Sequence, residues 1–275
     1  MNLTNLRKKI ILQLTSHSDT PQLDADLLLM HVLQKTRTQL LMDESIVEAR
    51  FIASLDQLIT RRINGEPIAY ILGSQPFWTM DLIVTPDVLI PRAETECLIE
   101  WVLKQLFDAN NYQVADLGTG SGAIAIALAL EKPHWQIDAT DQSAKALLIA
   151  RQNAKKYNAK NISFFESDWF DALPPKKYDL IISNPPYIAQ NDAHLEKLIF
   201  EPISALTSGK TGLDAIENIT QQAMHYLQPN GYLVIEHGYD QAEAVFKLFE
   251  QAGFYEVKNH CDLSGIPRFV TGMKS

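Results

Sequence analysis

From Glu94 onward, the chain alternates between short apolar runs of strand length and longer amphipathic runs of helix length. The spacing predicts strands over Gln113–Leu117, Trp135–Thr140, Ile162–Phe165, Tyr178–Ser183, Tyr232–His237 and Phe254–Asn259. It predicts helices over Glu94–Phe107, Ala123–Leu130, Ala144–Lys156, Asp214–Leu227 and Gln241–Gln251. This order predicts an α/β domain with a doubly wound, mostly parallel sheet. Ligands of such sheets bind at the carboxyl ends of the strands, so the chemistry is expected there.

The first 65 residues carry a helical pattern instead, with apolar side chains every three or four residues. Examples are Leu3, Leu6, Ile10 and Leu14, and later Phe51, Leu55, Leu58 and Ile59. After Gly65-Glu66-Pro67, the apolar segments Ala69–Leu72 and Phe77–Val84 are separated by turn residues, which predicts a short β-hairpin. We therefore expect a helical domain over 1–65, a β-hairpin linker over 66–90 and a catalytic domain over 91–275.

Charge and composition exclude several classes of protein. The net charge is −9, and because residues 1–75 carry eight basic and eight acidic side chains, all of it belongs to the remainder. An acidic chain is poorly suited to direct nucleic-acid binding, which depends on phosphate neutralisation by Lys and Arg. The longest apolar run, Ala123–Leu130, is far shorter than the roughly 20 residues of a membrane span. With two cysteines far apart and no signal peptide or coiled coil, we expect a cytoplasmic monomer without a metal site.

A glycine-rich loop follows the first predicted strand of the catalytic domain, in the sequence Asp116-Leu117-Gly118-Thr119-Gly120-Ser121-Gly122. Glycines at alternate positions allow a sharp turn and the close approach of a ligand. The helix after Gly122 adds its N-terminal amides to the ligand site. The loop also fits a dinucleotide fingerprint loosely, and a tight turn without a ligand is a third interpretation.

Two acidic residues favour one of these interpretations of the glycine loop. Asp116 ends its strand just before the glycines, where a carboxylate would repel a pyrophosphate but attract an ammonium group. Asp141 ends the next strand, where it can accept hydrogen bonds from both hydroxyls of a ribose. A cationic amino-acid end and an unphosphorylated ribose together describe S-adenosylmethionine better than a nicotinamide cofactor.

A third strand end carries Asp168 and Trp169. We expect Asp168 to accept the amino group of adenine and Trp169 to pack on its ring. The alternatives are a helix cap for Asp168 and a core aromatic for Trp169.

The tetrapeptide Asn184-Pro185-Pro186-Tyr187 follows the strand Tyr178–Ser183. Its prolines fix the backbone, so the side-chain carbonyl of Asn184 and the backbone carbonyl of Pro185 become two acceptors at a rigid spacing. Such a pair can hold both hydrogens of a planar NH2 group, and the Tyr187 ring can stack on it. Because an amide nitrogen is a poor nucleophile and a sulfonium is an activated methyl donor, positioning and electrostatics are the main contributions required of the protein.

Taken over essentially its whole length, the sequence resembles the N5-glutamine methyltransferases of bacterial peptide chain release factors. The glycine loop and the NPPY tetrapeptide are shared with many amino-methyltransferases, whereas the more specific segments are the linker Arg62–Gly73, Ile90-Pro91-Arg92, and Asp262 to Arg268. The sequence departs from the family pattern at Ala93, where a second proline is usual, and at Thr211, where an aspartate is usual.

This resemblance implies a Rossmann-like class I S-adenosylmethionine-dependent methyltransferase fold, with a seven-stranded sheet and a small helical N-terminal domain that helps to recognise the substrate. The implied substrate is the glutamine of a Gly-Gly-Gln loop, and the second product is S-adenosylhomocysteine. The implied cofactor contacts are Asp116, Gly118, Thr119, Gly120, Gly122, Asp141, Asp168, Trp169 and Asn184. The implied substrate contacts are Asn184, Pro185, Pro186 and Tyr187, with Phe77 and Arg92 at the mouth unless they only pack the hairpin or pair with an acid.

Two other enzymatic functions share the same motifs. A ribosomal-protein glutamine methyltransferase would have the same loop and NPPY, so only the N-terminal domain and linker can separate the two functions, and the linker favours the release factor. A DNA or RNA adenine N6-methyltransferase would use NPPY on a flipped base, but it predicts a basic face. A non-catalytic adaptor has no use for an intact loop and tetrapeptide. The acidic catalytic part also suggests attraction of a basic release-factor segment.

Overall fold

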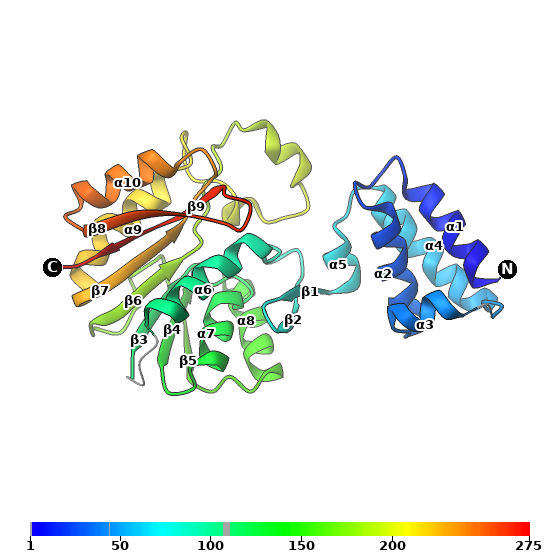
Figure 1. Ribbon diagram of the computed structural model, residues 1–275, viewed down its shortest axis with the longest axis horizontal. Helices are drawn as coiled ribbons and strands as arrows, with labels where there is room; N and C mark the ends of the chain where they lie inside the picture. Colours follow the sequence, from blue (N-terminus) through cyan, green and yellow to red (C-terminus); the bar gives the residue numbers. More distant parts are fainter. Residues whose placement is uncertain (1, 44, 107–110) are drawn as a thin grey trace. The chain divides into compact units, whose positions relative to one another are not determined.

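The computed structural model describes residues 2–43, 45–106 and 111–275. These residues form two compact units, Met1–Ser74 and Gln75–Ser275, which are described separately (Figure 1). The boundary between the units falls inside the segment predicted as a linker. The division into a helical domain, a linker and a catalytic domain remains a prediction.

The first unit is helical. Its helices are α1 (Leu3–Leu14), α2 (Pro21–Leu33), α3 (Arg37–Met42), α4 (Ala49–Ile63) and α5 (Ile68–Leu72). Leu6 and Ile10 of α1 pack with Leu28 of α2 and Leu55 of α4 in one apolar core, as the helical spacing predicts. Two arginines reach the buried acids of α2, because a buried carboxylate requires a partner: Arg62 Nε lies 2.6 Å from Asp24 and Arg7 Nε 2.5 Å from Asp26.

A hairpin lies in the segment predicted for it, but it pairs other strands than expected, and its turn falls inside the predicted strand Phe77–Val84. It pairs β1 (Ser74–Phe77) with β2 (Met80–Ile83). The expectation of a strand over Ala69–Leu72 is wrong, because Ile68–Leu72 forms the helix α5. Pro67 precedes this helix, and Gly73 ends it in the left-handed conformation at φ 74°. A proline before and a glycine after a segment favour one short helical turn.

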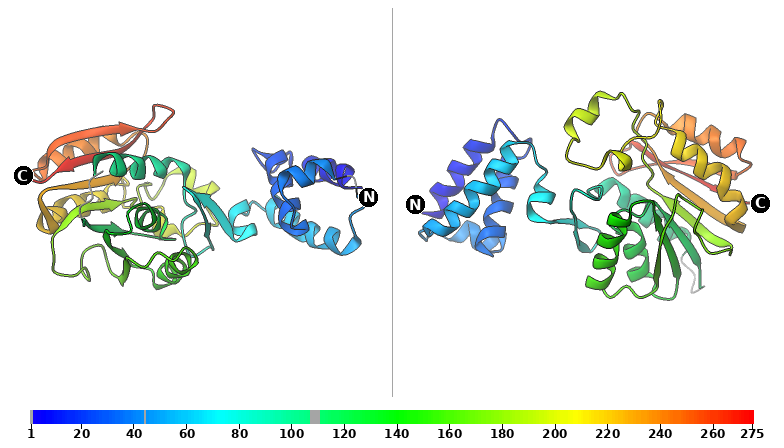
Figure 2. Two further views of the ribbon diagram at one scale, coloured as in Figure 1. Left: turned by 60° about the horizontal axis from the view of Figure 1, so that its bottom comes forward. Right: turned by 180° about the vertical axis from the view of Figure 1, so that it is seen from behind.

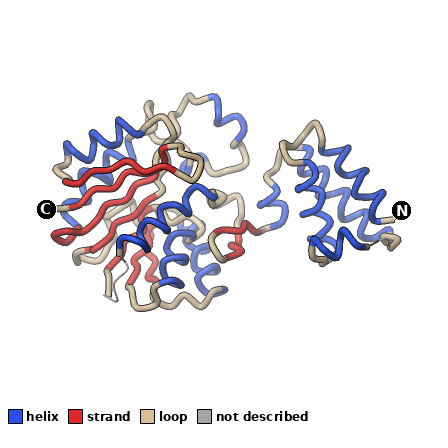
Figure 3. Tube along the Cα trace, in the orientation of Figure 1, coloured by secondary structure: helices blue, strands red, loops and turns tan. Residues whose placement is uncertain are grey.

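A seven-stranded sheet forms the centre of the second unit (Figure 3). Its strands are β3 (Gln113–Leu117), β4 (Gln136–Asp141), β5 (Ile162–Glu166), β6 (Tyr178–Ser183), β7 (Leu227–Glu236), β8 (Tyr255–Cys261) and β9 (Pro267–Met273). The spatial order is β5-β4-β3-β6-β7-β9-β8. The strands from β5 to β7 are parallel to their neighbours, whereas β9 runs antiparallel to both β7 and β8. The predicted mostly parallel, seven-stranded sheet is therefore confirmed.

Helices cover both faces of this sheet (Figures 1 and 2). On one face, α6 (Glu96–Gln105) and α7 (Ala123–Glu131) form a continuous apolar core with alternate residues of the central strands, and α8 (Ala144–Lys156) lies beside α7. On the other face, α9 (Asp214–Tyr226) and α10 (Ala242–Gln251) pack against the intervening strand residues. Ile181 and Ile182 of β6 show the alternation, since they belong to opposite cores.

Among the described residues, the remaining helical segments are three short 3-10 turns, η1 (Ala93–Thr95), η2 (Ala193–Lys197) and η3 (Ile203–Ala205). The helix predicted from Glu94 therefore begins as η1 before α6, and its predicted end at Phe107 lies outside the described residues. Within the ranges that the structure describes, no helix combines the length and the apolar character needed to cross a membrane.

Candidate active site

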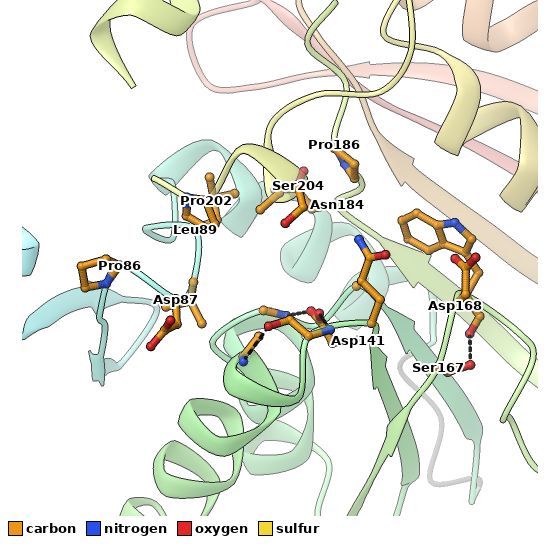
Figure 4. Close-up of a pocket in the computed structure, with 18 residues that line it drawn as sticks. Pro86, Asp87, Leu89, Asp141, Ser167, Asp168, Asn184, Pro186, Pro202 and Ser204 are labelled. Carbon is orange, nitrogen blue, oxygen red and sulfur yellow. Dashed lines mark hydrogen bonds between the residues drawn. The ribbon is translucent and has the colours of Figure 1, made fainter. Parts of the chain in front are cut away.

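A pocket opens at the carboxyl ends of β3, β4, β5 and β6 (Figure 4). The sheet order changes direction between β3 and β6, which is where doubly wound sheets bind ligands. Seven of the predicted site residues line it, namely Gly118, Gly120, Asp141, Asp168, Trp169, Asn184 and Pro186. The other predicted residues are Phe77, Arg92, Asp116, Thr119, Gly122, Pro185 and Tyr187, which lie outside the lining.

The glycine loop has the left-handed backbone that its sequence requires. Gly118, Gly120 and Gly122 have φ values of 71°, 57° and 85°. A β-carbon on Gly118 would stand 3.3 Å from the Trp169 ring, and one on Gly122 would stand 2.8 Å from Ile126. A β-carbon on Gly120 would meet nothing within 4 Å, so this backbone faces open space in the pocket. Glycine therefore serves backbone conformation at all three positions and close packing at two of them.

Asp116 lies directly beneath this loop and is only 1% exposed. Its Oδ2 accepts hydrogen bonds from Thr119 Oγ1 at 2.6 Å and from the backbone nitrogen of Ala125 at 3.2 Å. Its Oδ1 is buried and has no hydrogen-bond partner among the described residues. Burial raises the pKa of Asp116 to about 7, against the effect of these two hydrogen bonds. A buried carboxylate oxygen without a partner is suited to a cationic ligand group.

Asp141 closes the neighbouring strand and lines the pocket. Its Oδ2 accepts from the backbone nitrogen of Gly120 at 2.9 Å, and its Oδ1 accepts from that of Ser143 at 2.8 Å. Burial raises its pKa in spite of these bonds. Each carboxylate oxygen has a second acceptor site, so the side chain can still accept from two neighbouring hydroxyl groups.

Asp168 and Trp169 follow β5, and both line the pocket, where Figure 4 labels Asp168. Asp168 is exposed, whereas Trp169 is partly buried and has a positive φ of 45°. The backbone carbonyl of Trp169 accepts a hydrogen bond from Ser167 Oγ at 3.2 Å. Trp169 also packs on the apolar core of the α9 and α10 face, so it contacts both this core and the pocket.

The NPPY tetrapeptide begins where β6 ends. Ser183 Oγ donates to the backbone carbonyl of Leu117 at 2.7 Å, which joins the ends of β6 and β3. Asn184 and Pro186 line the pocket, and Pro185 between them is buried. The adjacent strands β3 and β6 therefore bring the tetrapeptide next to the glycine loop, as the strand-end argument predicts.

A separate set of contacts holds the backbone of Tyr187. Gln241 Nε2 donates to the carbonyl oxygen of Tyr187 at 3.0 Å and to that of Thr211 at 3.4 Å. Gln241 Oε1 accepts from the backbone nitrogen of Gly238 at 2.8 Å. Since Thr211 contributes its backbone carbonyl to this contact, the departure from the family pattern at this position leaves the contact in place.

Phe77 and Arg92 have structural partners. Phe77 is 1% exposed and belongs to the core under α6 and α7. Arg92 forms an ion pair with Glu201 at 2.5 Å, and the same carboxylate accepts from the backbone nitrogen of Ile90 at 3.1 Å. These contacts match packing and pairing with an acid, the alternatives to a substrate contact, and a substrate role for either residue remains a prediction.

Several lining residues were missed by sequence reasoning. They come from the segment after the hairpin, from the turn after Asp141 and from the loop around η3: Pro86, Asp87, Val88, Leu89, Gln142, Ser143, Ala146, Ser167, Pro202, Ser204 and Ala205. A strand-end acid, Glu236 of β7, was also overlooked, although the rule that selected Asp116 and Asp141 applies to it equally.

The residues present fit S-adenosylmethionine. The unpartnered Oδ1 of Asp116 suits an ammonium group, and the open space over Gly120 leaves room for the ligand backbone. Asp141 suits a ribose. Throughout the described part of the chain, no group of three or more His, Cys, Asp or Glu residues is arranged to hold a metal ion.

Comparisons with known proteins agree with this fold. Residues 94–209 match the family model of the methyltransferase small domain, and residues 5–73 match that of the PrmC N-terminal domain. A methyltransferase from Pyrococcus furiosus, 17% identical, superposes with a TM-score of 0.55 over 78% of this chain and 97% of its own. The Thermus thermophilus 16S rRNA N2 G1207 methyltransferase, solved with AdoMet and guanosine, is 18% identical, with a TM-score of 0.56 over 74% of this chain and 50% of its own. The fold is that of the class I S-adenosylmethionine-dependent methyltransferases.

Curated relatives define the family more narrowly. The release factor glutamine methyltransferase of Coxiella burnetii is 47% identical over 275 residues, which are 100% of this chain and 99% of that protein. The enzyme of the same name from Escherichia coli K12 is 41% identical over 93% of each chain. This chain belongs to the family of release factor glutamine methyltransferases, as the resemblance predicted.

Proposed function

We propose that this chain transfers a methyl group from S-adenosylmethionine to the side-chain amide nitrogen, N5, of the glutamine in the Gly-Gly-Gln motif of peptide chain release factors. One observation carries the proposal: the NPPY residues Asn184 and Pro186 line the same pocket as Gly118, Gly120 and Asp141. An amide-binding pair and a cofactor loop in one pocket bring the two reactants together, and family membership supplies the substrate class.

At the cofactor end, S-adenosylmethionine when bound supplies a methyl group activated on a sulfonium. Asp116 Oδ1 accepts from the ammonium of the cofactor, and Asp141 accepts from the ribose hydroxyls. Asp168 accepts from the adenine amino group, and Trp169 packs on the adenine ring. The backbone of Gly118, Thr119, Gly120 and Gly122 lies against the amino-acid end. Val88 and Ala205 also line the pocket, and with the ligand bound their apolar side chains reduce its contact with water.

At the substrate end, Asn184 Oδ1 and the Pro185 carbonyl accept the two N–H groups of the glutamine amide. This contact orients the amide nitrogen toward the cofactor and increases electron density on it. Tyr187 stacks beside the amide plane. In this role the protein acts through orientation and electrostatics, with no covalent intermediate.

The partner in this proposal is a release factor that presents a basic Gly-Gly-Gln loop. The helical unit contributes to its recognition, and the acidic charge, which residues 76–275 account for in full, attracts the basic loop. We place the reaction in the bacterial cytoplasm and assign it to a monomer.

The test is incubation with labelled S-adenosylmethionine and, in parallel, a release factor, a ribosomal protein preparation and DNA. We expect label on the factor alone, and mass spectrometry should locate it on the glutamine of the Gly-Gly-Gln motif. Changing that glutamine to alanine should abolish the label. Label only on DNA, or on the ribosomal protein, would replace the proposed substrate, and label that survives the glutamine change would refute the site.

A further inference from the structure

Two linked hydrogen bonds, one buried and one partly buried, connect Glu236 to Asn184 through Thr95. Glu236 is the last residue of β7 and is 2% exposed, and its Oε2 accepts from Thr95 Oγ1 at 2.7 Å. Thr95, in η1, is 4% exposed, and its Oγ1 accepts from Asn184 Nδ2 at 3.1 Å. The three side chains come from segments far apart in the sequence. The last of them, Asn184, lines the pocket.

The direction of this chain follows from the chemistry of its first member. An ionised carboxylate can only accept, so the single hydroxyl hydrogen of Thr95 is directed at Glu236. The Thr95 oxygen can then only accept a hydrogen bond from Asn184. Its partner must therefore be the donor Nδ2 of the Asn184 amide and not the acceptor Oδ1. The amide of Asn184 is thereby held in one of its two flipped orientations, with Oδ1 left for the pocket.

We propose that Glu236 is a positioning residue of the active site, which acts through Thr95 to keep the carbonyl oxygen of Asn184 directed at the substrate amide. The inference rests on the proposed function, because an acceptor is needed at this place only for an NH2 substrate. If the amide of Asn184 flipped, Nδ2 would face the N–H groups of the glutamine, and two donors would oppose each other.

Glu236 also contacts the other end of the tetrapeptide, since Tyr187 Oη donates to its Oε1 at 3.4 Å. The charged and titratable groups that face it are Arg268 of β9, Glu94 of η1 and Tyr187, together with the thiol of Cys97 of α6. Burial raises the pKa of Glu236 to about 7, although Arg268 and the hydroxyls of Thr95 and Tyr187 favour its ionised form. A protonated carboxyl must donate from one oxygen, which would reverse the hydroxyl of Thr95 or of Tyr187. Turnover should therefore rise with pH through about 7.

The experiment compares Thr95→Val, which removes the hydroxyl at nearly constant volume, with Thr95→Ser, which keeps it, and with Glu236→Gln. Methylation of the release factor should fall about tenfold in kcat for Thr95→Val and Glu236→Gln, and Thr95→Ser should restore most of the rate. The Kd for S-adenosylmethionine should change less than about twofold, because neither Thr95 nor Glu236 is among the residues proposed to contact the cofactor. Glu236→Gln should also flatten the rise in kcat with pH. Thr220→Val is the matched control, since Thr220 is buried in α9 and donates only within its helix, to Ile216.

A double variant separates positioning from general destabilisation. If Glu236 acts through Thr95, Glu236→Gln should cost little further rate in a Thr95→Val background. Fully additive losses, or a Thr95→Val enzyme with unchanged kcat, would overturn the inference.

A spectroscopic measurement keeps the inference testable if the release factor proves to be the wrong substrate. The side-chain NH2 resonances of Asn184, assigned by their loss in Asn184→Ala, should shift with pH through about 7 in the wild-type protein. The shift should vanish in Thr95→Val. If these resonances do not respond to pH in the wild type, the relay is absent whatever the substrate. If they respond and no factor is methylated, only the proposed function fails.

Discussion

The carbonyl oxygen of Tyr187 and the α-carbon of Gly212 approach each other so closely that a β-carbon on Gly212 would stand 2.2 Å from that oxygen. This glycine also has a φ of 77°. The segment before α9 therefore packs against the backbone carbonyl of Tyr187, the last residue of NPPY. Gln241 Nε2 donates a hydrogen bond to the same carbonyl. A side chain at position 212 cannot be accommodated unless the tetrapeptide moves.

Gly212→Ala should accordingly lower kcat by roughly 100-fold, since misplacing a positioning group by about 1 Å costs this much. The matched control is Gly265→Ala, because Gly265 has a similar φ of 78° but nothing within 4 Å of the added carbon. Both variants carry the backbone strain, and only Gly212→Ala carries the clash. Thermal melting should show a loss of stability in both variants, larger in Gly212→Ala, and steady-state kinetics should show a loss of rate in Gly212→Ala alone. Equal rates in the two variants would contradict the supporting role of Gly212.

The sheet and the edge that carries the pocket could be predicted from the sequence because both follow from local regularities. Alternating strands and helices define the layers, and a strand-end acid before a glycine loop marks the carboxyl edge of β3. Asp141 and Asn184 were found by the same rule, since each follows a buried strand. The helix at Ile68–Leu72 was not predicted because five consecutive apolar residues fit both the helical and the strand periodicity. Pro67 before it and Gly73 after it favour the helix.

The partners of the site residues could not be predicted in this way. Thr95 and Glu236 are 141 positions apart in the chain, and their contact depends on how η1 packs at the end of β7. Val88 and Ala205 likewise line the pocket because of how their segments pack in the folded protein. Such contacts are made by tertiary packing and leave no periodic pattern in the sequence.

Asn184→Ala removes the side-chain acceptor proposed for the glutamine amide. We expect kcat to fall by roughly 100- to 1000-fold, the loss typical of one preorganised electrostatic group. Cofactor affinity, measured by calorimetry, should stay within about twofold, because most proposed cofactor contacts lie in the glycine loop and in Asp141. Asn259→Ala, at an exposed position of β8, is the control and should leave both quantities unchanged. A large loss of cofactor affinity in Asn184→Ala would move this residue from the substrate to the cofactor.

Arg92→Met tests whether the Arg92–Glu201 pair is structural. The change leaves Glu201, whose side chain is 2% exposed, with only the backbone nitrogen of Ile90 as a donor. Loss of one member of such a pair should lower the free energy of unfolding by about 2 kcal/mol. This corresponds to a fall in Tm of about 4–8 °C for a domain of this size. Arg50→Met is the control, since Arg50 and its partner Glu48 are both largely exposed. Normal stability with a raised KM for the release factor would instead make Arg92 a substrate contact.

The last prediction concerns Asp116, whose pKa is raised to about 7 by burial. The proposed contact with the ammonium of the cofactor needs the ionised carboxylate, so affinity should be greatest above pH 7 and decline as the pH falls through this value. Asp116→Asn should bind S-adenosylhomocysteine more weakly at pH 8 and with a flatter pH profile. Methylthioadenosine, which lacks the amino-acid end, is the control ligand, and its affinity should not follow the ionisation of Asp116.

The same pKa shift has an opposite consequence for folding. A carboxyl whose pKa rises from 3.8 to about 7 on folding binds its proton more tightly in the folded state, so its contribution to stability is full below pH 4 and is lost as the pH rises to 7. Asp116→Asn should therefore gain stability relative to the wild type between pH 5 and pH 8 when both are melted without ligand. If Asp116 serves ligand binding, ligand affinity should rise with pH while the stability of the ligand-free protein falls with pH. A carboxylate with a purely structural role would not raise ligand affinity as it ionises. If Asp116→Asn left both profiles unchanged, Asp116 would have neither role.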